Sequence, residues 1–295
     1  PLAPLQQNVK HRIILLLIAC ALTGNLFAAA NSPQRKQFLW RVVNAPAPFY
    51  LVGSMHALHR DDYPTDLGEF NRAIDQSEKF IFERDPAVND PTELWRKLSA
   101  QGTYPHGVTI QQRVSRSTFA LLKRIARIPQ GAYERQKPWA IAAFNLKAQG
   151  METVKSKWSM DHYINEKTRH RGETGGLETI DEFVRSFSEM SDRESESFLL
   201  QSIEYGRSPE LLDQTIAAWK SGSTQRIYQL YAPRGNGPDG YWRWIEKRSS
   251  SWIPRIEDAM KSRKPTMVIV GALHCCGPRG VLAQLQARGY RLEQR

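Results

Sequence analysis

The chain has 295 residues, of which 41% are hydrophobic and 24% are charged, so it can bury a core as one large domain or two intimate halves. The formal net charge of +11 is a value that also suits nucleic-acid-binding proteins. However, Lys and Arg are spread along the whole chain in twos and threes, with carboxylates between them. We therefore expect no nucleic-acid partner.

The first thirty residues have the pattern of a secretory signal. Lys10 and Arg12 form a basic start, an apolar run follows over 13–20, and three alanines at 28–30 supply a small-residue cleavage site. We expect residues 1–30 to be a signal peptide that is cleaved near Ala30. The remaining domain, residues 31–295, would be periplasmic or secreted.

Two other interpretations of this segment stay open. The apolar run is short for a membrane span, so we expect no stable span after cleavage, but an uncleaved anchor is the first alternative. The second is a lipoprotein signal, because Cys20 follows Leu-Ile-Ala. Loss of Lys10 and Arg12 with the signal lowers the formal charge from +11 to +9.

The remaining cysteines, Cys275 and Cys276, are adjacent and cannot join distant loops, so core packing must hold the fold. They could be soft metal ligands, form a vicinal disulfide, or take no part in the chemistry. We favour the last interpretation.

The N-terminal part of the mature chain predicts a hairpin and a third strand. Short β-prone runs occupy 38–43 and 48–53, with a turn at 44–47 between them. A helical stretch over 66–77 precedes a third strand over 79–83. These strands would begin a sheet.

A long helical region follows, and strands return only at the C-terminus. The pattern is helical from 91 to 170 with proline and glycine breaks. After a short glycine-rich piece at 175–177, Thr179 and Glu182 form a capping box that predicts a helix start. The later elements expected are helices to 231, a loop at 234–238, a helix over 239–263 kinked near Pro254, a strand over 266–271, a helix over 279–288 and a strand over 290–293. The fold class is thus α/β, with a mixed sheet from N-terminal and C-terminal strands and a large helical insertion.

One sequence pattern occurs twice. Residues 50–56 read Tyr-Leu-Val-Gly-Ser-Met-His and residues 268–274 read Val-Ile-Val-Gly-Ala-Leu-His. In each, a strand stops at a glycine and a histidine follows three residues later, at the sheet edge where α/β proteins bind ligands. A single copy would suggest a histidine that only fills a loop. Two matched copies favour His56 and His274 meeting over neighbouring strands.

Carboxylates stand at equivalent places. Glu83 ends the third strand, and Glu178 follows the glycine-rich piece. Imidazole and carboxylate ligands suit a divalent ion such as Mn, Co or Zn, and a free carboxylate could act as general base. Alternatively, Glu83 pairs with a nearby base and Glu178 complements a helix N-terminus. Asp161 follows the expected N-cap Ser159, and an acidic residue in the first helical turn is favoured by the helix dipole without any catalytic role.

At these residues the sequence resembles the TraB/GumN family, which is related to the Tiki metalloproteases. The resemblance spans nearly all of the mature chain, and its motifs are Phe-Leu-Trp-Arg-Val at 38–42, the two histidine motifs, Asp-Tyr-Pro at 62–64, Gly-Leu-Glu-Thr at 176–179, Gly-Pro at 277–278 and Gly-Tyr at 289–290. It implies an α/β fold of the erythromycin-esterase and ChaN-like kind. For the Tiki branch it implies a metal-dependent peptidase.

The resemblance also implies roles for single residues. His56 and His274 match the family's two histidines, and Glu83 and Glu178 match its glutamates. Asp161 matches an acidic residue of the helix before Glu178, which would contact the ligands rather than the ion. We expect His56, His274 and Glu83 as metal ligands and Glu83 and Glu178 as catalytic carboxylates.

Arg248 looks like the arginine of the family's Glu-Arg-Asn motif, where it could stabilise an oxyanion or hold a carboxylate. Here Lys247 and Ser249 replace the flanking Glu and Asn. The cysteine pair after His274 is a second departure from the family pattern.

The expected function is metal-dependent hydrolysis, of a peptide bond in the preferred interpretation. The alternative is a non-catalytic envelope protein that binds peptide or polysaccharide, because GumN members are associated with exopolysaccharide production. A shared fold does not decide between them.

Overall fold

The sheet of this protein joins N-terminal and C-terminal strands of the described residues, as a computed structural model shows. The structure describes residues 36–295 except 57, 64–66, 126–129, 147–157 and 233–238. The predicted signal, Cys20 and the expected loop at 234–238 lie outside these residues. Residues 37–295 form one unit.

Six strands of the described chain form one mixed sheet in the order β4-β3-β5-β2-β1-β6. Four of them are parallel, and β1 pairs antiparallel with β2 on one side and β6 on the other. Their bounds are β1 Leu39–Val42, β2 Phe49–Ser54, β3 Lys79–Phe82, β4 Glu173–Gly176, β5 Thr266–Gly271 and β6 Leu292–Gln294. The predicted hairpin and the α/β fold class are confirmed.

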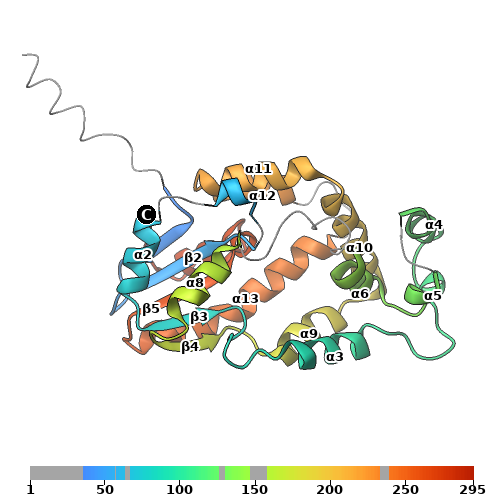
Figure 1. The fold of residues 1–295 in the computed structure, drawn as a ribbon, viewed down its shortest axis with the longest axis horizontal. Coiled ribbons are helices and arrows are strands. Elements are labelled where there is room, and N and C mark those ends of the chain that lie inside the picture. The colour runs from blue at the N-terminus through green and yellow to red at the C-terminus, as the bar shows by residue number, and fades with distance from the viewer. Residues whose placement is uncertain (1–35, 57, 64–66, 126–129, 147–157, 233–238) are drawn as a thin grey trace, which may run out of the picture. The chain divides into compact units, whose positions relative to one another are not determined.

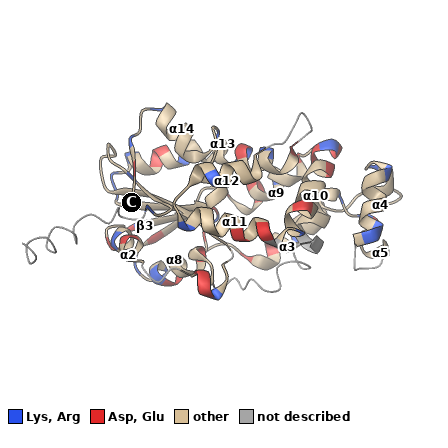
Figure 2. Cartoon of the chain, turned by 90° about the horizontal axis from the view of Figure 1, so that it is seen from above, with Lys and Arg blue, Asp and Glu red and all other residues tan. Residues whose placement is uncertain are grey.

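The central strands β2 and β5 are buried along their whole length, because helices cover both faces of the sheet. Figures 1 and 2 show α2 (Gly68–Asp75) and α8 (Met160–Thr168) on one face, and α13 (Gly240–Lys261) and α14 (Val281–Ala287) on the other. Apolar side chains from all four helices join one core with the strands. Burial of this apolar area is what drives the layers together.

The helical insertion between β3 and β5 carries a second core. Side chains from α3, α4, α6, α9 and α10 form it. The 22-residue helix α13 contributes to both cores, with Trp252 in the first and Trp244 packed against the second. The remaining described helices are η1 Arg60–Asp62, α3 Pro91–Gln101, η2 Ile110–Gln112, α4 Arg116–Ile125, α5 Gln130–Tyr133, α6 Pro138–Ala140, η3 Ile141–Leu146, α9 Ile180–Ser188, α10 Asp192–Gly206, α11 Pro209–Lys220, α12 Thr224–Tyr231 and η5 Ala272–Cys275.

Two local signals in the sequence are confirmed at helix starts. Thr179 accepts a hydrogen bond from the Glu182 backbone N–H, and the Glu182 side chain accepts from the Thr179 N–H, which completes the capping box of α9. Ser159 caps α8 by accepting from the His162 N–H. These caps place Glu178 and Asp161 at the starts of their helices.

The charged residues of this part of the chain are interleaved. In Figure 2, blue and red segments occur together on most of the labelled helices, although only Lys and Arg are coloured on α4. In the described ranges, no helix has the length and apolar character that a membrane crossing requires.

A matched pair of valines tests where the stability of the fold resides. Val268 on β5 is completely buried and Val88 is 74% exposed. We expect Val268→Ala to lower the free energy of unfolding by about 2 kcal/mol, through lost apolar burial and a cavity. Val88→Ala should change it by less than about 0.5 kcal/mol. Urea denaturation measures both, and equal effects would contradict this assignment of the core.

Candidate functional site

The ends of four neighbouring parallel strands carry the residues that the sequence singled out. Glu83 directly follows β3, Glu178 lies two residues after β4, and His56 lies two residues after β2. His274 follows β5 in the short helix η5. Helices α8 and α13 add Asp161 and Arg248, so all six residues belong to one cluster.

Glu83 stands at the centre of this cluster. Its Oε1 lies 4.0 Å from His56 Nε2 and 3.7 Å from His274 Nε2, and it accepts a 2.8 Å hydrogen bond from the Gly271 N–H. Its Oε2 accepts from Arg248 Nη2 at 2.8 Å. Burial would raise the pKa of Glu83, but the positive charge of Arg248, the two imidazoles and the Gly271 N–H together lower it. Glu83 is therefore ionised.

The Asp161 carboxylate contacts the Nδ1 side of the His56 ring, which is opposite to the side that faces Glu83. Its Nδ1 lies 2.8 Å from Asp161 Oδ2, and the Ser54 hydroxyl donates to Asp161 Oδ1 at 2.7 Å. The pKa of Asp161 is lowered although burial acts to raise it, because His56 and Ser54 stabilise the ionised form. This arrangement directs Nε2 of His56 toward Glu83, while 62% of the imidazole side chain stays exposed.

His274 is buried and neutral. Arginine can only donate, so the 3.2 Å contact between Arg248 Nη1 and His274 Nε2 makes Nε2 an acceptor. Nδ1 then carries the proton and donates to Ser249 Oγ at 2.8 Å, and the Ser249 hydroxyl donates onward to the Ile245 carbonyl. Burial, helped by Arg248, lowers the pKa of His274 to about 3.

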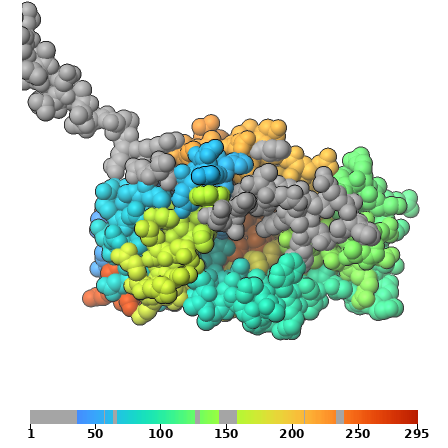
Figure 3. Space-filling model, in the orientation of Figure 1, coloured from blue at the N-terminus to red at the C-terminus, as the bar shows by residue number. Residues whose placement is uncertain are grey.

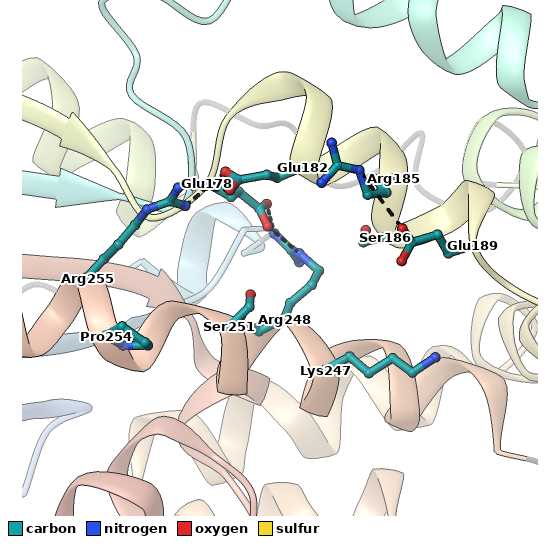
Figure 4. A pocket seen from close by; sticks show the side chains of 10 residues that line it. All are labelled: Glu178, Glu182, Arg185, Ser186, Glu189, Lys247, Arg248, Ser251, Pro254 and Arg255. Carbon is teal, nitrogen blue, oxygen red and sulfur yellow. Dashed lines mark hydrogen bonds and ion pairs between the residues drawn. The ribbon is translucent and has the colours of Figure 1, made fainter.

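Arg248 and Glu178 form a buried ion pair. Arg248 donates through Nε at 3.2 Å and Nη2 at 2.5 Å to the two oxygens of Glu178 (Figure 4). Trp252 Nε1 also donates to Glu178 Oε2 at 3.2 Å. Burial opposes the charge of Arg248, but the two glutamates outweigh it and raise its pKa.

Aromatic rings surround the guanidinium of Arg248. Its central carbon lies 4.6 Å from the Trp244 ring centroid, 4.7 Å from that of Trp252 and 5.1 Å from that of Phe183. Cation–π attraction at this range adds to the ion pairs. The rings also exclude water, which strengthens every charge interaction inside.

The two glycines of the repeated motif serve different purposes. At Gly271 a Cβ atom would lie 2.6 Å from His56 Nε2 and 3.3 Å from Glu83 Oε1, so only glycine leaves room for the site. At Gly53 a Cβ would meet the Phe38 ring at 2.4 Å, and the Gly53 carbonyl accepts from Trp219 Nε1. Gly271 therefore leaves room for the side chains of His56 and Glu83, and Gly53 leaves room for the Phe38 ring in the core.

Sequence reasoning missed three supporting residues, namely Ser54, Ser249 and Trp252. Ser54 lies inside the first histidine motif and Ser249 is adjacent to Arg248, so proximity to a motif was the available signal. Cys275 and Cys276 are both buried with free thiols, and burial raises the pKa of each. Cys276 Sγ donates to the Ala272 carbonyl at 3.1 Å.

The donor atoms around Glu83 are of the kinds that transition metals bind in proteins. Ligands about 2.1 Å from one ion lie roughly 3 to 4 Å apart, and both imidazole nitrogens are within that range of Glu83 Oε1. In the part of the chain that the structure describes, however, no group of three or more His, Cys, Asp or Glu side chains forms a ready metal site. The Nε2 atom of His274 already accepts a hydrogen bond from Arg248.

A hollow in the surface lies over the elements that carry these residues. The space-filling view shows it between α8 and α3, with α13 visible on its floor (Figure 3). Asp161 comes from α8 and Arg248 from α13. The fold and this cluster define an α/β protein with a His, Glu and Arg site at the carboxyl edge of its sheet.

The chain belongs to the TraB/PrgY/gumN family, whose family model matches residues 38–294. The resemblance seen in the sequence motifs is thereby confirmed. No curated protein and no solved structure matches the chain.

The buried ion pair makes a prediction for stability. Arg248→Met should lower the free energy of unfolding by about 3–5 kcal/mol, because the carboxylates of Glu178 and Glu83 would stay behind without their partner. Arg248→Met/Glu178→Gln should recover part of this loss, since one stranded charge is removed. Lys261→Met is the control, because Lys261 forms an exposed ion pair with Asp258. Urea denaturation measures all three, and a double variant that is less stable than Arg248→Met would refute the stranded-charge explanation.

Proposed function

We propose that this protein is a hydrolase, dependent on a divalent metal ion, that cleaves a peptide bond. The observation that carries the proposal is the position of Glu83 Oε1, within 4.0 Å of ring nitrogens from two different strand ends. Imidazole and carboxylate donors in this arrangement suit Mn, Co or Zn. Membership of the family supports the same chemistry by analogy only.

His56 and Glu83 would hold the ion, and His274 would join them when Arg248 gives up Nε2. Asp161 orients His56 for this task through the Nδ1 contact, as carboxylates commonly do for metal-bound histidines. A bound ion would polarise the substrate carbonyl and acidify a water molecule. Glu83 is ionised, as both a ligand and an acceptor of a water proton must be.

Arg248 and Glu178 take complementary parts in the proposal. The guanidinium of Arg248 would stabilise negative charge that develops on the substrate oxygen. Both oxygens of Glu178 are engaged by Arg248 and Trp252, so we assign Glu178 to holding Arg248 in place. A base role for Glu178 would need one of these contacts to break.

Metal addition to the purified protein tests the proposal. Mn, Co or Zn should bind and switch on cleavage of a peptide library, and a chelator should stop it. Glu83→Gln should lower kcat about a hundredfold or more, the scale of a lost ligand or base. His56→Ala should weaken metal binding measured by calorimetry while the fold stays cooperative. Glu166→Gln, on the exposed side of α8, is the control and should change neither.

Two results would decide against this function. Absence of metal binding would contradict the ligand set. Metal binding without turnover, together with saturable binding to an acidic exopolysaccharide, would favour the non-catalytic envelope protein. The formal charge of +9 on residues 31–295 is compatible with that alternative.

We also infer that the chain is exported, on the basis of the basic start, the apolar run and the alanines of residues 10–30. An alkaline-phosphatase fusion to residues 1–40 should be active outside the cytoplasm. Mass spectrometry should find a mature N-terminus at Asn31. An intact N-terminus on membrane-bound protein would show an anchor, and lipid on Cys20 would show a lipoprotein.

A further inference from the structure

A polar groove of about 410 Å³ lies between α9 and α13. Its volume is in the range of sites that hold small ligands or a few residues of a peptide. Figure 4 shows α9 and α13 as its two walls, with Glu178 and Arg248 pointing toward one another between them. The described residues that line it are Glu178, Glu182, Arg185, Ser186, Glu189, Lys247, Arg248, Ser251, Pro254 and Arg255.

We propose that this groove binds an acidic side chain of a peptide substrate, with Arg185 on α9 and Lys247 on α13 pairing its carboxylate. The proposal rests on the proposed peptidase function for its purpose, but the binding it describes can be measured without catalysis.

The first argument is the position of the groove. Arg248 lines it and also donates to Glu83 and His274, so one guanidinium separates the groove from the centre of the site. A chain segment that fills the groove therefore lies next to the residues assigned to the chemistry. Contacts made there can position the bond to be cleaved.

The second argument is that two cations of the groove lining, Arg185 and Lys247, have weak ion pairs. Glu182 is neutralised by Arg255, which donates to both of its oxygens at 2.9 and 2.8 Å. Among the described residues, the one ion pair of Arg185 is a 4.0 Å contact with Glu189. Lys247 has a 3.4 Å contact with Glu194, which does not line the groove. Both cations are more than half exposed, so they can turn toward a ligand at small cost.

The third argument separates a peptide from a sugar polymer. The described lining contains no aromatic ring on which a sugar could stack. All of its carboxylates stand on the α9 side, and the charged residues of its α13 side are all cations. This mixture suits a ligand that offers backbone N–H groups together with an acidic side chain. A uniformly anionic polymer would be repelled by Glu189, which has only a 4.0 Å contact with Arg185.

Calorimetry with blocked peptides tests the proposal on the purified protein. The probe is a short Gly, Ala and Ser peptide with one central Glu and capped ends, compared with the same peptide carrying Gln. The Glu peptide should bind at least fivefold more tightly at low salt, and the difference should shrink at 0.5 M salt because exposed charges are screened. Equal affinity for the two peptides would overturn the proposal.

Variants locate the binding. Arg185→Gln/Lys247→Gln should weaken binding of the Glu peptide about five- to tenfold. Arg116→Gln/Lys261→Gln removes the same net charge from α4 and from the far end of α13, and should leave the affinity within twofold. Glu189→Gln removes the carboxylate that competes for Arg185 and should strengthen binding about twofold. Equal losses in the two double variants, or weaker binding in Glu189→Gln, would overturn the assignment.

The outcome is separable from that of the proposed function. Binding of the Glu peptide that depends on Arg185 and Lys247, without cleavage under any metal, would support the groove and refute the peptidase. Cleavage of peptides with the same KM in wild type and in Arg185→Gln/Lys247→Gln would support the peptidase and refute the groove. Tighter binding of an oligogalacturonate than of the Glu peptide, lost in the same double variant, would refute the peptide assignment.

Discussion

The buried guanidinium of Arg248 is the constraint on which the site depends. Its contacts reach Glu83 after β3, Glu178 after β4 and His274 after β5, so one side chain of α13 ties three strand ends together. Arginine keeps its charge at any ordinary pH, and burial of a lone charge is prohibitive. Glu83 and Glu178 must therefore be in place beside Arg248 whenever the helix is packed on the sheet.

This constraint makes two histidines with matching sequence motifs physically different. His274 is enclosed by Arg248, Ser249 and the Trp252 ring at 4.3 Å, and it stays neutral with a fixed tautomer. His56 faces solvent, with its Nδ1 2.8 Å from Asp161 and its Nε2 4.0 Å from Glu83. An exposed imidazole can exchange a ligand or proton with the solvent, whereas a buried one serves as a fixed acceptor. The site thus has one solvent-exposed histidine, His56, and one buried histidine, His274.

Arg248 also connects the groove between α9 and α13 to Glu83. Glu178 and Arg248 line the groove between α9 and α13, and Arg248 also donates to Glu83 at the centre of the cluster. A ligand in the groove would change the field at Glu83 and His274 without touching them. In a water-poor surrounding of aromatic rings, such changes are weakly screened. Arg248 is thus the side chain through which charges in the groove and the charge of Glu83 interact.

The sequence by itself determined the features that depend on neighbours a few residues apart. The capping box of Thr179 and Glu182, the cap at Ser159 and the apolar strands that end in Gly53 and Gly271 were all predictable for this reason. The α/β class followed from the order of these elements, and the family motifs indicated the six site residues.

Only the tertiary structure decided which of these residues touch and in what state. The residues 173–176 form a regular strand because β3 pairs with them, although two glycines give them little β propensity. Arg248 finds Glu178 seventy residues away and Glu83 at a separation of 165, which no local pattern encodes. The neutral tautomer of His274 follows from its burial beside Ser249 and Arg248. Hydrogen bonds and desolvation act between atoms close in space, so only the packing of α13 on the sheet defines them.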